Sequence, residues 1–287
     1  MFRSLSLSAT ICLMAGAAAA EVTYANAFAK YHNFDVDGAG DADAFSLGGA
    51  IEYRMMDWTF NAELGRIDIE DVDFDFGTIG AGYQMRNGVT LGLDYTRFEI
   101  DSFDSDVVSG YAMLDAGSYA LGASIGDGSD LDDTVYSIFG AMDVTANGRV
   151  GLDIVRIEDE TLYAGYADYD MQGYELKADV ISMDGFDLVA VAGAYEFGNG
   201  FSAIASLSHL DLLGLDGNAF TIGGRYEFAP GVNAELALGQ IDFDGAQDID
   251  QITFGVQYEL GDKTSKRRSL GNIFSSATSS LSGLTSF

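Results

Sequence analysis

The sequence has very little cysteine and proline, with one residue of each among 287. The cysteine, Cys12, lies in a leading stretch where Arg3 precedes the apolar run LSLSATICLMAGAAAA and three alanines (18–20) precede Glu21. This pattern predicts a secretory signal peptide over residues 1–20, and the residues before Cys12 do not form a good lipoprotein cleavage site. The mature chain therefore has no thiol, which excludes a disulfide framework.

A long apolar run is also missing after residue 20. A helix that spans a membrane needs about 20 consecutive apolar residues, and no stretch of the mature chain approaches that length. Any membrane span must therefore be built from β-strands, whose backbone groups are all satisfied only in a closed barrel. A soluble exported protein with one large or two smaller domains is the alternative.

Basic residues are scarce: the chain has 14 Lys and Arg against 45 Asp and Glu, a formal net charge of −31. All of the acidic residues lie within 21–262, whereas four of the basic residues follow Asp262. Such a charge repels nucleic acid and anionic substrates and attracts cations. High charge often accompanies disorder, but the 48% of hydrophobic residues argue against it here.

Glycine and aromatic residues are abundant, with 36 Gly, 15 Tyr and 19 Phe, which favours β-structure with many tight turns. A short pattern also repeats, in which a tyrosine stands two residues before Met, Phe or Leu. It occurs in GGAIEYRM (48–55), GAGYQM (80–85), AGAYEF (192–197), GGRYEF (223–228) and GVQYEL (255–260). Tyr53 to Tyr83, Tyr195 to Tyr226 and Tyr226 to Tyr258 are 30, 31 and 32 positions, about the length of one β-hairpin.

Two kinds of connection alternate along the chain. Short connections, several with Asn-Gly or another glycine, are strong hairpin signals; they lie at 56–57, 86–88, 115–118, 145–148, 170–173, 198–200 and 229–231. Acidic connections lie at 35–43, 68–75, 99–106, 127–133, 158–160, 184–185, 211–216 and 242–250. Together they separate sixteen predicted strands of about ten residues. Fourteen strands are the alternative, because the alternation is blurred in 22–34, 107–114 and 149–170.

Apolar and polar residues alternate within the strands, as in QITFGVQYEL (251–260), so each strand has one apolar face. The alternation alone would also fit a soluble sandwich. The unbroken series of hairpins, the aromatic strand ends beside the tight turns and the acidic connections at the opposite end favour a membrane barrel instead. We therefore predict an all-β protein, a transmembrane up-and-down antiparallel β-barrel over residues 21–262 in the outer membrane.

The signal peptide, the mature start EVTYANAFAKY, the strand ends of the form GxxY-E-(F/L) and the closing QITFGVQYEL together resemble the Gram-negative porin family, in particular small porins of the alphaproteobacterial type. The resemblance covers 21–262. It implies a water-filled pore for passive diffusion of small hydrophilic solutes and ions, commonly in a homotrimer. The implied partners are outer-membrane lipid, lipopolysaccharide and the barrel-insertion machinery.

Porins of this family usually fold a long external loop into the lumen as a constriction. No predicted connection here exceeds nine residues. Either wall side chains form the constriction, or a strand boundary is misplaced.

If the apolar faces meet lipid, the polar residues of the opposite faces line the pore. Rings of carboxylates favour cations, so we predict a cation-preferring channel; a wide lumen with solvated side chains and little selectivity is the alternative. The candidate pore-lining residues are Glu52, Arg54, Glu63, Asp94, Glu175, Lys177, Asp179, Glu196, Arg225, Glu227, Glu235 and Glu259.

No enzyme activity, cofactor or nucleic-acid partner is predicted. The alternatives to a porin are a non-conducting structural or adhesive barrel and, less favoured, an outer-membrane hydrolase. His209 lies beside Ser208 and near Asp211, but neighbours on a strand point to opposite faces, so Ser208 and His209 cannot form a nucleophile–base pair.

A weak calcium candidate is the spacing of Asp35, Asp37, Asp41 and Asp43, which resembles a ligand loop but lacks the terminal Glu of an EF-hand. Plain solvation of these external carboxylates is favoured over loose binding of divalent ions. No resident metal is predicted.

Residues 263–287 form a tail of a different character, basic at GDKTSKRR and then rich in serine. We expect it to be disordered. An amphipathic periplasmic segment is an alternative, because apolar residues recur at helical spacing at Leu270, Phe274, Ala277, Leu281 and Leu284. A third is that Phe287 ends an additional strand, although LSGLTSF alternates poorly.

Overall fold

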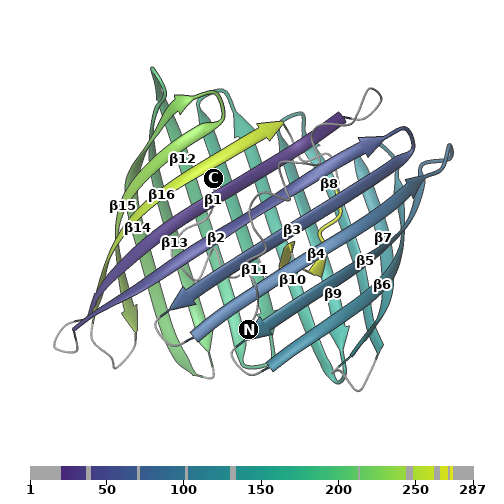
Figure 1. The fold of residues 1–287 in the computed structure, drawn as a ribbon, viewed down its shortest axis with the longest axis horizontal. Helices are drawn as coiled ribbons and strands as arrows, with labels where there is room; N and C mark the ends of the chain where they lie inside the picture. The colour runs from purple at the N-terminus through teal and green to yellow at the C-terminus, as the bar shows by residue number, and fades with distance from the viewer. Residues whose placement is uncertain are drawn as a thin grey trace, which may run out of the picture.

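The computed structural model describes residues 21–36, 40–69, 72–100, 103–129, 134–212, 214–243, 248–261, 266–270 and 272–273. Within these residues, sixteen antiparallel strands form one closed barrel (Figure 1). The strands are β1 (Glu21–Val36), β2 (Gly40–Met55), β3 (Trp58–Ile69), β4 (Val72–Gln84), β5 (Val89–Ile100), β6 (Phe103–Asp115), β7 (Tyr119–Gly128), β8 (Thr134–Thr145), β9 (Gly148–Ile157), β10 (Glu160–Met171), β11 (Tyr174–Met183), β12 (Phe186–Gly198), β13 (Phe201–Leu212), β14 (Leu215–Ala229), β15 (Val232–Phe243) and β16 (Ile249–Gly261).

Each strand pairs with the next in the sequence, and β16 pairs with β1. The closing register runs from Tyr24 opposite Gly261 to Val36 opposite Ile249. Closure removes the sheet edges, which would otherwise expose backbone donors and acceptors. The predicted up-and-down barrel of sixteen strands is therefore confirmed, and the alternative of fourteen strands is wrong.

Seven tight turns stand at one rim, the upper one in Figure 1, where the sequence predicts them. Several depend on glycine in the left-handed region: φ is +83° at Gly88, +83° at Gly173 and +79° at Gly200. Glycine adopts this conformation without the steric cost that a Cβ would impose. The chain therefore reverses within two to four residues at this rim.

The connections at the opposite rim are shorter than the acidic segments predict. The expected connection 35–43 is strand up to Val36 and again from Gly40, and 68–75 is interrupted only between Ile69 and Val72. Arg66 explains the second case, because its guanidinium lies 2.7 Å from the Asp73 carboxylate and 3.5 Å from that of Asp75. These cross-strand ion pairs reduce carboxylate repulsion, so the acidic stretches continue as strand.

The outer face of the barrel carries a broad band of exposed apolar side chains, such as Leu93, Leu121 and Leu236, which are 65%, 58% and 56% exposed. Aromatic rings contact each other across strands beside the tight turns. Ring centroids are 5.1 Å apart for Trp58 and Tyr83 and 4.4 Å apart for Phe201 and Tyr226. Helices long and apolar enough to cross a membrane are absent from the part of the chain that the structure describes.

Candidate functional site: the barrel lumen

The twelve residues predicted to line a pore all lie on strand positions that alternate with the apolar outer face. They differ in how deeply they are enclosed. Glu52, Asp94 and Glu235 are buried, Glu63, Glu175, Lys177, Asp179, Arg225 and Glu259 are half-buried, and Arg54, Glu196 and Glu227 are exposed.

The repeated Tyr-Glu pairs of the sequence build a carboxylate layer near the turn rim. In each pair the tyrosine faces outward, so the following glutamate faces the lumen. Glu175, Glu196, Glu227 and Glu259 line one cavity together with Arg225, whose guanidinium lies 3.3 Å from the Glu175 carboxylate. We call these four glutamates the carboxylate layer.

A recurring backbone bond sets the height of this layer. The amide N–H of Glu196, Glu227 and Glu259 donates to the carbonyl of Gly173, Gly200 and Gly231 respectively, at 2.9, 2.8 and 2.8 Å. Each carbonyl belongs to the turn of the preceding hairpin. The same local geometry, repeated around the rim, therefore holds these three carboxylates at one level.

Buried polar side chains join the strands on either side of the barrel closure. Lys30 of β1 and Glu235 of β15 form an ion pair at 2.7 Å, each with 4% of its side chain exposed. His32 lies 3.0 Å from the Thr253 hydroxyl and 3.3 Å from the Ser46 hydroxyl, which belong to the two strands that flank β1. This part of the wall is thus connected by side chains as well as by backbone.

The C-terminal segment enters the lumen, which differs from the disordered tail that we expect from its composition. In Figure 1 the yellow part of the chain lies inside the ring of strands. Lys266 donates to the backbone carbonyl of Gly117, and its ammonium lies 3.2 Å from the Asp143 carboxylate and 3.5 Å from that of Asp115. Residues 274–287, including Phe287, lie outside the described residues.

A helical turn begins at Ser269. The amide N–H of Asn272 donates to the Ser269 hydroxyl at 3.1 Å, and the amide N–H of Ser269 donates to the Asn272 side-chain oxygen at 3.0 Å, a reciprocal cap. The Asn272 side-chain amide also donates to the Glu63 carboxylate on β3. The segment is therefore bound to the wall beyond its three basic residues.

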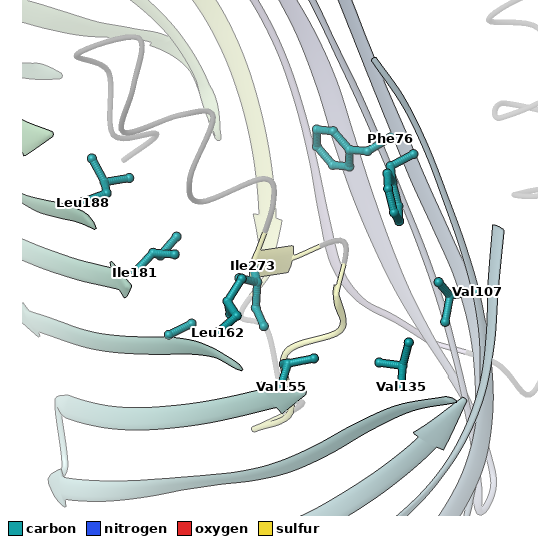
Figure 2. Packing of buried hydrophobic residues seen from close by; sticks show 10 residues of the cluster. Phe76, Val107, Val135, Val155, Leu162, Ile181, Leu188 and Ile273 are labelled. Atoms are coloured by element: carbon teal, nitrogen blue, oxygen red, sulfur yellow. The ribbon is translucent and has the colours of Figure 1, made fainter. Parts of the chain in front are cut away.

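An apolar cluster inside the lumen receives the end of this segment. Figure 2 shows Ile273 among wall side chains that point into the barrel. Ile273 is 3% exposed, and Leu270 packs against the same cluster. The wall contributes Phe76, Phe98, Val107, Val135, Val155, Leu162, Ala164, Ile181 and Leu188, from strand segments nearer the acidic rim. We call these wall residues the apolar belt.

Sequence reasoning missed the lumenal position of residues 266–270, 272 and 273. The signal was present as charge: the cluster Lys266, Arg267 and Arg268 follows a chain segment that holds every acidic residue. The missing constriction loop was a second signal. Residues 266–270, 272 and 273 occupy part of the lumen. A wall-built constriction or a misplaced strand boundary is therefore not needed to explain why no long loop enters the lumen.

The remaining sequence candidates lie at the acidic rim. Asp43 accepts hydrogen bonds from the Tyr31 hydroxyl at 2.6 Å and from the Asn33 amide at 3.0 Å, and Asp35 and Asp41 are cross-strand partners. Asp37 lies outside the described residues. Within the described ranges, no group of three or more His, Cys, Asp or Glu is placed to hold a metal ion.

His209 faces outward at the same rim, where its Nδ1 lies 3.1 Å from the Asn218 side-chain oxygen and 3.5 Å from the Asp216 carboxylate. Ser208 occupies the next position of the strand and is half-buried, whereas His209 is exposed. The histidine therefore contacts side chains of β14 rather than its neighbouring serine.

No protein-family model matches the chain, and no curated protein matches it. Solved structures similar to it include Pseudomonas aeruginosa OpdQ, with a TM-score of 0.52 and 10% sequence identity over 84% of this chain and 98% of that chain. Pseudomonas aeruginosa OpdO has a TM-score of 0.50 and 12% identity over 84% and 97%. Acinetobacter baumannii OccAB3 has a TM-score of 0.50 and 8% identity over 85% and 100%.

At these identities the likeness concerns the fold. The chain's closed, antiparallel barrel of sixteen strands is similar in fold to these solved structures over most of their length.

Proposed function

We propose that this protein is an outer-membrane porin that lets small hydrophilic solutes and ions diffuse through its lumen, with a preference for cations. The carboxylate layer carries the proposal. Its four glutamates face one cavity at the turn rim, and Arg225 is the positively charged residue that lines this cavity. A layer of carboxylates raises the local concentration of cations and lowers that of anions.

The surroundings of the lumen support the location. The band of exposed leucine, isoleucine and valine on the outer face is suited to lipid, and the aromatic rings beside the turns are suited to a membrane interface. The porin fold supports the same location. Export by a signal peptide over 1–20, contact with lipopolysaccharide, assembly as a homotrimer and an alphaproteobacterial type of porin belong to this proposal as expectations from the sequence.

The test is the reversal potential of the purified protein in a planar bilayer with a tenfold KCl gradient. We expect conduction and a sign that shows cation preference. The triple substitution Glu196→Gln, Glu227→Gln and Glu259→Gln should reduce the potential clearly. The matched control Glu158→Gln, Asp159→Asn and Asp184→Asn removes the same charge at the opposite rim and should have a smaller effect. Anion selectivity of the unmodified channel would overturn the cation preference.

A non-conducting structural or adhesive barrel is the second candidate. The observation that favours it is the packing of Leu270 and Ile273 against the apolar belt, which narrows the lumen. The same bilayer measurement separates the two functions. A folded, inserted barrel without any single-channel current would replace the porin by the structural barrel.

A further inference from the structure

Two consecutive arginines of the C-terminal segment occupy two similar sites on the inner wall. The guanidinium carbon of Arg267 lies 3.9 Å from the centre of the Tyr111 ring and 5.5 Å from that of Phe139. Its guanidinium also forms an ion pair with Asp94, whose side chain is 1% exposed. Arg267 is therefore held by an aromatic face and a buried carboxylate.

Arg268 repeats this arrangement farther around the wall, on the adjacent strands β10 and β11. Its guanidinium carbon lies 4.5 Å from the centre of the Tyr166 ring, and its Nη2 lies 2.9 Å from an oxygen of Asp179. Aromatic faces attract guanidinium ions through the ring quadrupole, and more strongly where water is excluded. We call Tyr111 with Asp94 the first cradle and Tyr166 with Asp179 the second cradle.

The wall itself shapes both cradles. The residue directly opposite Tyr111 on β5 is Gly92, and the residue opposite Tyr166 on β9 is Gly151. A Cβ at Gly92 would lie 2.4 Å from the Tyr111 ring, and one at Gly151 would lie 2.1 Å from the Tyr166 ring. Each ring thus lies flat over a glycine and turns its face to the lumen.

We propose that the two cradles bind the guanidinium or ammonium groups of small basic solutes, and that Arg267 and Arg268 are resident ligands which an entering solute displaces. The inference rests on the proposed channel function and adds the class of solute to it. Two aromatic faces and two carboxylates already hold two guanidinium groups of this chain. Glycines in the wall leave the space in which the two tyrosine rings lie.

Tethering sets the concentration at which a solute can compete. A binding group on a short flexible linker acts at an effective concentration of about millimolar. Free arginine must therefore reach at least this range to displace the segment from the unmodified protein. Without the two tail arginines the same cradles should fill at lower concentration.

The test uses the full chain with Arg267→Gln and Arg268→Gln, compared with the unmodified channel in a planar bilayer. The probes are arginine and citrulline, which have similar shape but differ in charge. We expect arginine to cause current blockades in the double variant at a concentration at least about fivefold lower than in the unmodified channel. Citrulline should cause few blockades in either channel.

Two further sets of variants decide whether the cradles are responsible. Asp94→Asn with Asp179→Asn, placed in the R267Q/R268Q background, should remove the arginine blockades. Arg66→Gln, at the acidic rim, is the matched control and should leave the arginine concentration dependence of the unmodified channel unchanged. Equal blockade by arginine and citrulline, or blockades that persist after both aspartates are changed, would overturn the inference.

If no variant conducts, calorimetric titration of arginine into the folded R267Q/R268Q barrel in detergent still tests whether the cradles bind arginine. Binding of arginine but not citrulline, lost with D94N and D179N, would support the cradles even though the proposed channel function had failed. Absence of arginine binding in a conducting channel would overturn the cradles and leave the channel function standing.

Discussion

Gly151 shows how a single residue can position an aromatic ring on the inner wall, because it lies directly opposite Tyr166. Gly92 and Gly122 have the same relation to Tyr111 and Phe139, their cross-strand neighbours. The pattern places an aromatic residue and a glycine at paired positions of adjacent strands. A flat ring leaves room in the lumen, whereas an upright ring would narrow it.

Gly151→Ala should therefore tilt Tyr166 away from the wall. The added Cβ would overpack the pair, which typically costs about 1–3 kcal/mol of folding free energy. The measurement is the urea midpoint of unfolding in micelles, followed by the fluorescence of the single tryptophan, Trp58. Gly165→Ala on the neighbouring strand is the control, because a Cβ there has its nearest contact at 3.8 Å. Equal midpoints for the two variants would contradict the role assigned to Gly151.

The buried ion pair between Lys30 and Glu235 gives a second prediction at this scale. Glu235→Gln leaves a buried ammonium without its carboxylate, which should cost about 3–5 kcal/mol. Replacing both, as Lys30→Met with Glu235→Leu, should cost much less, because a buried pair exchanged for apolar residues is often neutral. A double-mutant cycle on urea unfolding provides the measurement. If the double variant lost as much stability as E235Q, the pair would not be coupled.

The elements differ in how far the sequence predicts them. The turns at 86–88 and 198–200 were predictable because each holds asparagine and glycine, whose turn chemistry is local. The strand ends near Ile69 and Val72 were not, because an acidic run is typical of a solvated loop until Arg66 is known to form ion pairs with Asp73 and Asp75 of the next strand. Cross-strand partners depend on the register, which the sequence pattern alone does not show.

The C-terminal segment is the element whose placement depends most on tertiary contacts. Its serine-rich composition suggests disorder, yet Ile273 packs against the apolar belt and Asn272 donates to Glu63. The helical spacing of Leu270, Phe274 and Ala277 stays a prediction, because Phe274 and Ala277 lie outside the described residues. What the pattern did not reveal is that the apolar partner of this segment lies inside the barrel.

Ile273→Asp should release this segment from the apolar belt, because a carboxylate buried among apolar side chains loses its hydration. We expect a larger single-channel conductance and faster tryptic cleavage after Lys266, Arg267 and Arg268. Ile273→Val, which keeps an apolar contact, is the control and should behave like the unmodified protein. Unchanged conductance and protection in I273D would show that Ile273 does not hold the segment.

At the scale of the whole molecule, the barrel wall carries the negative charge and the C-terminal segment in its lumen carries a cluster of positive charge. The chain is strongly acidic up to Asp262, and the cations of residues 266–268 lie against wall carboxylates such as Asp94 and Asp143. The sequence predicted the twelve lumen-facing candidates from alternation alone. It did not predict that part of their charge is balanced by the same chain, because that balance arises only when the barrel closes around the segment.

This separation of charge predicts how the ion selectivity of the channel should change when the C-terminal segment loses its positive charge. Lys266→Gln, Arg267→Gln and Arg268→Gln together remove three positive charges from the lumen and keep hydrogen-bonding side chains of similar length. The reversal potential in a KCl gradient should then shift toward stronger cation preference. The shift should shrink at high salt, since the screening length falls from about 10 Å at 0.1 M to about 3 Å at 1 M. Arg66→Gln removes one charge at the acidic rim, and its shift should be well below one third of that of the triple variant. A triple variant with unchanged selectivity at low salt would mean that residues 266–268 do not share the conducting space with the carboxylate layer.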